Sequence, residues 1–226
     1  MKGREIQRSD ILLGLSFLLM IAALYLVFIY VPTEATMGVV QRIFYFHVPV
    51  AWVSFLAFLV VFVGSILYLG KRESKWDILA YSSAEVGIVF TTLVLITGPL
   101  WAKPTWGVWW VWDARLTTTL VLWLIYLAYM MVRSFALEES QGARFAAVVG
   151  IVGFIDVPIV ALTIVLSRTQ HPGPVIFEGG LAASMLLTLL VSLAAFTVLY
   201  VLLLQLRISL REAEVEIAKL KQAQSP

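Results

Sequence analysis

Long apolar stretches dominate the chain and are separated by short polar segments. Six of them are long enough to cross a bilayer as a helix, which takes about 20 residues. Their predicted limits are Ile11–Val31, Val48–Gly70, Ile78–Leu100, Leu116–Val132, Phe145–Leu166 and Leu181–Leu206. The pattern predicts an all-α polytopic membrane protein, a bundle of six transmembrane helices that forms a single domain over residues 1–226.

The first apolar stretch follows a basic N-terminus, so a signal peptide is the alternative to a membrane anchor. The apolar core of this stretch is longer than the roughly 7–15 residues of a signal peptide. No small-residue cleavage pattern follows it. We therefore expect the stretch to remain as an anchor.

Basic residues are distributed unevenly between the two sets of connecting segments. An even number of spans puts both termini on one side, and the segments of that side hold twelve basic residues: Lys2, Arg4, Arg8, Lys71, Arg72, Lys75, Arg133, Arg144, Arg207, Arg211, Lys219 and Lys221. The opposite segments hold four, namely Arg42, Lys103, Arg115 and Arg168. Because basic loops stay on the cytoplasmic side, both termini are expected to be cytoplasmic. The opposite segments are then expected to face the periplasm from a bacterial inner membrane.

The composition excludes several classes of protein. Hydrophobic residues make up 61% of the chain and charged residues 13%, against about 25% charged in soluble domains. The net charge is only +2, and its distribution follows the topology, so no nucleic-acid-binding surface is expected. The chain has no cysteine, so it forms no disulfide and carries out no thiol chemistry.

The end of the chain, about residues 207–226, is expected to extend the last helix into the cytoplasm. Apolar residues recur there at alternating spacings of three and four: Leu203, Leu206, Leu210, Ala213, Ile217 and Leu220. This heptad seam covers about three heptads, which is short for a self-standing coiled coil. A solvated helical extension and a helix that docks a partner subunit both remain open.

Tryptophans cluster in the outward segment at about residues 101–116. Of the eight in the chain, Trp106, Trp109, Trp110 and Trp112 fall within seven residues, and Trp101 precedes them. Indole rings offer large, rigid apolar faces that suit a flat apolar ligand. The alternative is an interfacial aromatic belt, but a belt needs only one or two rings at each crossing. The cluster therefore favours a ligand platform.

The chain has two histidines, His47 and His171, and both map to the outward side. Two imidazoles that reach the same face as the tryptophans could supply both axial ligands of a haem iron. Zinc is a weaker alternative, because its sites use three or four protein ligands. An outward acid such as Asp113, Glu34 or Glu178 could complete such a site, so zinc stays open.

Two charged residues follow the tryptophans directly. Asp113 precedes a long apolar run and is expected to cap the helix of the fourth span; it could also fix the loop or contact a ligand edge. Arg115 could clamp ligand carboxylates such as haem propionates, or it could be an interfacial arginine that reaches toward the headgroups.

Two acids fall inside predicted spans, Glu85 in the third and Asp156 in the fifth. Intramembrane acids are costly and are often functional. Both could be protonated and hydrogen-bonded internally, Asp156 through carbonyl groups freed by a kink at Pro158. We expect them to act in packing or gating.

The stretch from Trp106 to Thr117, Trp-Gly-Val-Trp-Trp-Val-Trp-Asp-Ala-Arg-Leu-Thr, resembles the tryptophan-rich "WWD" signature of haem-handling membrane proteins. Its ending Asp-Ala-Arg-Leu-Thr resembles the cytochrome c maturation protein C (CcmC) branch. The stretch from Arg42 to Trp52, Arg-Ile-Phe-Tyr-Phe-His-Val-Pro-Val-Ala-Trp, is similar to that family's first histidine motif, and His171-Pro-Gly-Pro lies where its second histidine falls. With the matching length and span number, the resemblance covers nearly the whole chain.

The resemblance implies that His47 and His171 are axial ligands of a transiently held haem b. It implies that Trp106, Trp109, Trp110, Trp112 and Asp113 cradle the porphyrin. The expectation that Arg115 also binds haem comes from its place beside them in the sequence. It also implies delivery of haem to a chaperone (CcmE), together with a small helical protein (CcmD) and ABC transporter subunits (CcmA and CcmB). The chain itself has no phosphate-binding loop, so we expect a haem carrier in the bilayer and not a self-contained enzyme.

Two other functions compete with haem delivery. A haem lyase, which would join haem to an apocytochrome, is expected to need a longer chain, further histidines and a sizeable outward domain. A structural or quinone-binding membrane subunit would purify without iron. An optical spectrum of the purified protein separates the structural or quinone-binding subunit from the two haem-binding functions, haem delivery and haem lyase.

Overall fold

The computed structural model describes residues 2–136, 138–166, 169–173 and 179–224. Within these residues the chain forms helices joined by short segments, with one isolated bridge between Glu34 and Gly38. Six segments are long and apolar enough to cross a membrane: Ser9–Tyr30, Val39–Lys71, Ser74–Trp106, Ala114–Ser134, Ser140–Leu166 and Ala183–Lys221. The predicted all-α fold with six spans is confirmed.

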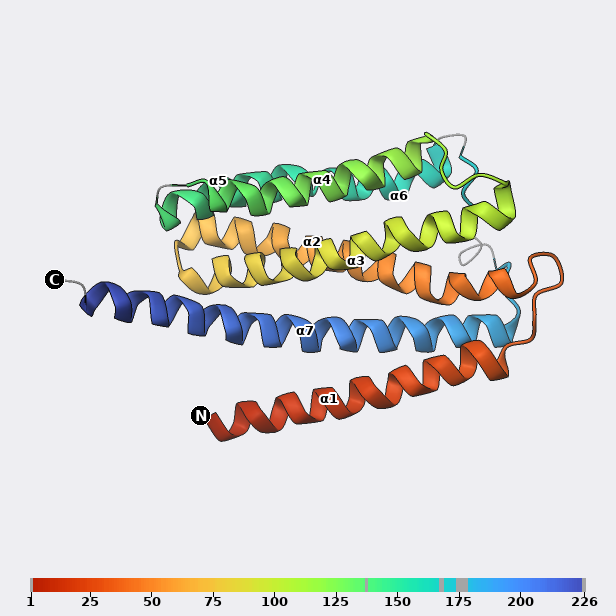
Figure 1. Ribbon diagram of the computed structural model, residues 1–226, viewed down its shortest axis with the longest axis horizontal. Coiled ribbons are helices and arrows are strands. Elements are labelled where there is room, and N and C mark those ends of the chain that lie inside the picture. Colours follow the sequence, from red (N-terminus) through yellow and green to blue (C-terminus); the bar gives the residue numbers. More distant parts are fainter. Residues whose placement is uncertain (1, 137, 167–168, 174–178, 225–226) are drawn as a thin grey trace.

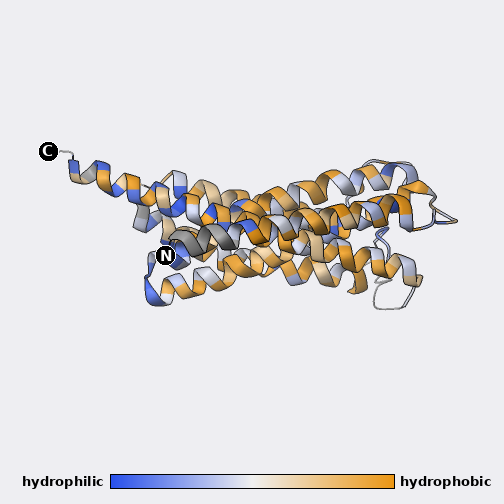
Figure 2. Cartoon of the chain, turned by 90° about the horizontal axis from the view of Figure 1, so that it is seen from below, coloured by the Kyte–Doolittle hydropathy of each residue, from blue (hydrophilic) through white to orange (hydrophobic). Residues whose placement is uncertain are grey.

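The helices run side by side along one axis (Figure 1). They are α1 (Lys2–Tyr25) with its π-helical end η1 (Leu26–Tyr30), the 3-10 turn η2 (Val39–Ile43), α2 (Phe44–Lys71), α3 (Ser74–Trp106), α4 (Ala114–Ser134), α5 (Glu139–Gly153), α6 (Asp156–Leu166) and α7 (Ala183–Gln224). Both termini lie at one end, here called the inner end, together with the α2–α3 and α4–α5 connections. The α1–α2, α3–α4 and α6–α7 connections lie at the other, outer end. Figure 2 shows hydrophobic residues along the bundle and hydrophilic residues gathered near the termini.

The largest cluster of buried side chains lies among α2, α3, α4, α5 and α6. At its centre the rings of Phe58 and Tyr126 stack with centroids 3.6 Å apart, and Leu122 is fully buried beside them. Close approach of α4 and α5 depends on Gly153, where a Cβ would lie 2.4 Å from a methyl carbon of Ile125. On the other side of α2, α7 packs between α1 and the α2–α3 pair. The bundle therefore has a densely packed interior around α2 and α3.

Ion pairs tie the helices together at the inner end. Arg133 of α4 donates two hydrogen bonds to the Asp77 carboxylate of α3, at 2.5 and 2.8 Å. Arg207 of α7 donates to Glu85 of α3, with its Nε 2.8 Å from the carboxylate. The hydrogen-bond partner of Glu85 is therefore an arginine 122 residues further along the chain, which no local pattern reveals.

The fifth span is broken into α5 and α6 at Phe154 and Ile155. The break comes before Pro158, which cannot donate to the Phe154 carbonyl; that carbonyl accepts from the Val157 N–H at 3.1 Å instead. Asp156 begins α6 and is 9% exposed. One of its carboxyl oxygens has no hydrogen-bond partner among the described residues.

The tryptophan segment is more helical than the expected loop at 101–116. Helix α3 continues to Trp106. Its 33 residues extend about 50 Å, so part of the helix projects beyond the ~30 Å hydrocarbon core. Gly107 ends α3 in the left-handed region, at a φ of 79°, where glycine has no Cβ penalty. Irregular backbone is confined to residues 107–113. At the other end α7 continues through the tail to Gln224, with Leu210, Ile217 and Leu220 exposed.

Candidate functional site

His47 lies in the first turn of α2, at the outer end, and faces α3. Its Nδ1 is 2.8 Å from Oγ1 of Thr97. Thr97 in turn donates its hydroxyl proton to the Leu93 carbonyl at 2.7 Å. Val48 was the predicted start of this span, but the 3-10 turn η2 leads directly into α2, so His47 is held by helix and not by a loop.

His171 comes from the α6–α7 connection and reaches the same place. The two imidazole rings have centroids 6.3 Å apart and are inclined by 39°. Nδ1 of His171 lies 3.0 Å from the Pro172 carbonyl, and its backbone N–H donates to Oγ1 of Thr169 at 3.1 Å. The fold thus brings together the two histidines that the sequence singled out.

Burial keeps His171 neutral. Loss of hydration, together with a smaller effect of the nearby Arg115 cation, lowers the pKa of His171 to about 4. The Asp113 carboxylate and the bond to the Pro172 carbonyl oppose this shift of the pKa without cancelling it. At neutral pH the imidazole therefore keeps a lone pair, which a metal ligand needs.

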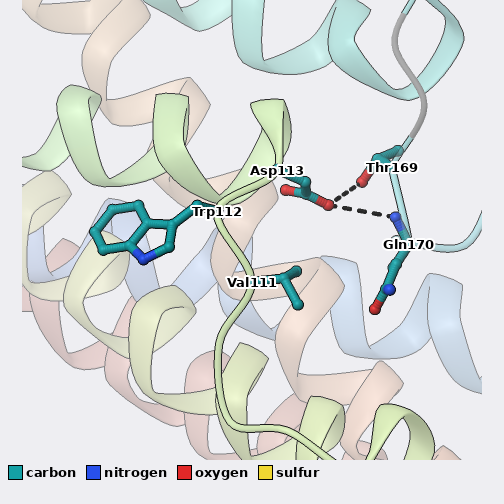
Figure 3. A pocket seen from close by; sticks show the side chains of 5 residues that line it. All are labelled: Val111, Trp112, Asp113, Thr169 and Gln170. Carbon is teal, nitrogen blue, oxygen red and sulfur yellow. Dashed lines mark hydrogen bonds between the residues drawn. The ribbon is translucent and has the colours of Figure 1, made fainter.

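Asp113 joins the two outer connections. One oxygen, Oδ1, accepts from the Leu116 N–H at 2.9 Å, so the expected N-cap of α4 is present. The other, Oδ2, accepts from the Thr169 hydroxyl at 2.5 Å and the Gln170 N–H at 3.3 Å. Figure 3 shows this carboxylate directed toward both partners. Asp113 therefore fixes the His171 segment to the start of α4.

An open hollow of about 500 Å³ lies beside this junction, lined by Val111, Trp112, Asp113, Thr169 and Gln170. Its volume falls within the range of roughly 300–1,000 Å³ common for small-molecule sites. In Figure 3 the indole of Trp112 extends away from Thr169 and Gln170. Trp112 is 75% exposed and Trp109 is 55% exposed.

The tryptophans pair edge to face and do not form one flat floor. Trp101 and Trp106 have centroids 5.4 Å apart at 88°, and Trp110 and Trp112 lie 5.6 Å apart at 75°. Trp109 lies under the Lys103 ammonium, 6.0 Å from the ring centroid. Trp109 and Trp112 are therefore the exposed indoles of this segment, and one face of Trp109 is shared with Lys103.

The outward charged residues are mostly engaged. Arg115 is half-buried and donates to the Val160 carbonyl of α6 at 3.1 Å, so it does not simply reach toward headgroups. The guanidinium of Arg42 lies 6.0 Å from the centroid of Phe28. The Glu34 carboxylate accepts from the N–H groups of Met37 and Thr36, and these bonds lower its pKa. The other candidates, Arg168 and Glu178, lie outside the described residues.

Metal-donor groups outside the histidine pair do not gather here. In the part of the chain that the structure describes, no three His, Cys, Asp or Glu side chains come together. The donor set is two imidazoles, which fits a metal whose remaining ligands come from a macrocycle. Sequence reasoning overlooked Thr97 and Thr169, which hold the histidines; threonine beside a histidine is too common to predict such a contact.

Six spans define a multi-pass membrane protein, and the two imidazoles and the exposed indoles at one end are its candidate ligand site. The chain belongs to the heme exporter protein C (CcmC) family, whose model matches residues 6–223. Heme exporter protein C of Bradyrhizobium diazoefficiens is 40% identical over 175 residues, which cover 76% of this chain and 66% of that protein. A putative cytochrome c biosynthesis ccmC-like mitochondrial protein of Marchantia polymorpha is 33% identical over 190 residues, 83% of this chain and 81% of that protein. Heme exporter protein C of Escherichia coli (strain K12) is 32% identical over 144 residues, 64% and 59% respectively.

Proposed function

We propose that this protein handles haem for cytochrome c maturation and holds it at the outer end of the bundle, with His47 and His171 as the two axial ligands. The observation that carries the proposal is the spacing of the two rings. With Nε2 of each ring directed at one metal between them, half of the 6.3 Å between the centroids would correspond to a metal–nitrogen bond of ~2 Å plus the radius of an imidazole ring. The residues present therefore fit a bis-imidazole iron.

The hydrogen bonds of the two rings support the same function. Nδ1 of each histidine is already engaged, with Thr97 in one case and the Pro172 carbonyl in the other. Nε2 of each ring remains for the metal, and a ligating histidine characteristically donates its other N–H to a protein oxygen. Bonds through neutral nitrogen are exchangeable, which suits transfer of haem to another protein.

The surrounding residues supply shape and position. The exposed indoles of Trp109 and Trp112 can cover the apolar porphyrin. Trp110 packs edge to face against Trp112, and Trp106, paired with Trp101, completes the tryptophan set. Asp113 acts by fixing the His171 segment, and Arg115 places a positive charge near the ligands that favours the carboxylate edge of haem b. Haem supplies the iron and its ligand exchange; the chain supplies ligands, orientation and an apolar surface.

The site is proposed to face the periplasm from the bacterial inner membrane. The twelve basic residues of the inner segments against four in the outer ones support this orientation through the positive-inside rule. Reporter fusions after Arg72, Glu139 and Pro226 should behave as cytoplasmic, and fusions near Thr105 and Gly173 as external. One reversed fusion would overturn the orientation.

The family implies partners outside this chain. We propose a CcmE-like chaperone as the haem acceptor, with CcmA/CcmB-like transporter subunits and a CcmD-like helical protein in the same assembly. The exposed seam of the α7 tail at Leu210, Ile217 and Leu220 is one surface available for such a contact.

Alanine substitution of the ligands tests the haem proposal. His47→Ala and His171→Ala should each lower copurified haem or change its absorption spectrum, because one axial bond is lost. Tyr30→Ala, which removes an exposed aromatic ring at the same end, is the control and should leave the spectrum unchanged. An unaltered low-spin spectrum in the double histidine variant would refute axial ligation by this pair.

A further inference from the structure

The hydroxyl of Thr97 contacts three groups near the outer end of α3. It lies 2.7 Å from the Leu93 carbonyl, 3.4 Å from the Val94 carbonyl and 2.8 Å from Nδ1 of His47. A hydroxyl carries one proton, and a carbonyl oxygen can only accept. The proton of Thr97 is therefore directed to the carbonyls of its own helix, and its oxygen lone pair faces the imidazole.

This arrangement determines which nitrogen of His47 carries the proton. Because Thr97 Oγ1 accepts along the contact with the ring, Nδ1 of His47 has to donate and is protonated. In a neutral imidazole the other nitrogen, Nε2, then has the free lone pair. We infer that Thr97 is a positioning residue that fixes His47 in the one neutral tautomer able to bind a metal through Nε2.

The two histidines differ in how their tautomers are set. Nδ1 of His171 faces the Pro172 carbonyl, a backbone acceptor that no side-chain substitution removes. Nδ1 of His47 faces a side-chain hydroxyl that threonine supplies and valine does not. A substitution of Thr97 can therefore change the tautomer of His47 while leaving that of His171 unchanged.

For metal binding the inference rests on the proposed haem function. An N–H of a ligating imidazole that donates to an oxygen makes the coordinating nitrogen more basic, and loss of such a partner commonly weakens metal affinity about 10–100-fold. Thr97→Val should therefore weaken haem binding by a factor in this range. A more basic ligand favours ferric iron, so the same substitution should raise the reduction potential of bound haem.

The tautomer can be measured without haem, because the chain has only two histidines. Haem-free protein labelled with ¹⁵N-histidine should show two rings, assigned with His171→Ala, each protonated at Nδ1 and bare at Nε2. Thr97→Val should move the His47 signals toward protonation at Nε2, and Thr97→Ser should restore the wild-type pattern. Thr188→Val is the control, since it removes a buried hydroxyl whose hydrogen bond goes to the Ser184 carbonyl of its own helix and not to a histidine.

The outcomes separate this inference from the proposed function. A wild-type His47 protonated at Nε2, or unchanged His47 signals in Thr97→Val, overturns the positioning role whatever haem does. If Thr97→Val changes the His47 tautomer but haem binds independently of His47, the proposed axial ligation is refuted, whereas the positioning role of Thr97 is supported. Weak haem binding by Thr97→Ser despite a restored tautomer would overturn the link between the tautomer and the affinity.

Discussion

The two ends of the bundle use charged and polar residues in different ways. At the inner end, arginines meet carboxylates directly and join α3 to α4 and α7. At the outer end, Arg115 and Asp113 bond to backbone groups, and the imidazoles face each other without a carboxylate between them. These paired inner charges therefore neutralise each other, while the outer end has two imidazoles and two exposed indoles for the haem that we propose it binds.

We expect this difference to separate the residues that stabilise the fold from those that bind the ligand. The inner pair Arg133–Asp77 has side-chain exposures of 8% and 14%, so each charge depends on the other. The outer contacts mostly hold short connections in place. Substitutions at the inner end should act on folding, and substitutions at the outer end on ligand binding.

The largest expected effect is at the inner end. Arg133→Ala leaves the Asp77 carboxylate buried without its partner, which should lower the free energy of unfolding by about 3–5 kcal/mol. Thermal unfolding in detergent measures the loss. The double variant Arg133→Ala with Asp77→Ala should recover part of it, and haem bound per folded molecule should stay normal. Loss of haem binding in folded Arg133→Ala would break the separation of the two ends.

The next effect concerns the tie between the outer connections. Asp113→Ala should cost about 1 kcal/mol through the lost cap of α4 and should also weaken haem binding, because the His171 segment is released. Thr169→Val removes the hydroxyl contact and keeps the cap, so it should weaken haem binding with little change in unfolding. Titration of haem into purified protein measures both variants. Full haem affinity in both would show that the tie has no role in placing His171.

The pH dependence of stability should reveal His171 in the haem-free protein. An unfolded imidazole titrates near pH 6.5, whereas the pKa of folded His171 is about 4. As pH falls through this window the unfolded state takes up a proton that the folded state does not, so stability is full above pH 6.5 and declines toward pH 4. Between pH 7 and pH 4.5 the unfolding midpoint should therefore fall less in His171→Gln than in the wild type. Equal losses would mean that His171 is not buried as a neutral ring.

The smallest effects are expected from single changes in the exposed indoles. Trp112→Phe keeps much of the flat apolar surface, so haem transfer to a coexpressed chaperone should fall only slightly. Trp112→Ala should transfer less haem than Trp112→Phe, and the triple alanine variant of Trp109, Trp110 and Trp112 should transfer the least. Trp76→Ala, at an indole in the first turn of α3 at the inner end, is the control. Normal transfer by the triple variant would leave these rings as an interfacial belt.

The sequence by itself determined the six spans, because hydropathy over about 20 residues is a local property and a bilayer leaves the backbone few alternatives to a helix. It also determined the cap at Asp113, which depends on a contact three residues away. Tertiary structure decided the rest. Glu85 finds Arg207 and His47 finds Thr97 across 122 and 50 residues, and Asp113 reaches Thr169 across 56. Such contacts depend on how helices pack and rotate against one another. The sequence therefore identified both histidines, but it could not identify Thr97 and Asp113–Thr169 as the contacts that orient the His47 ring and hold the His171 segment.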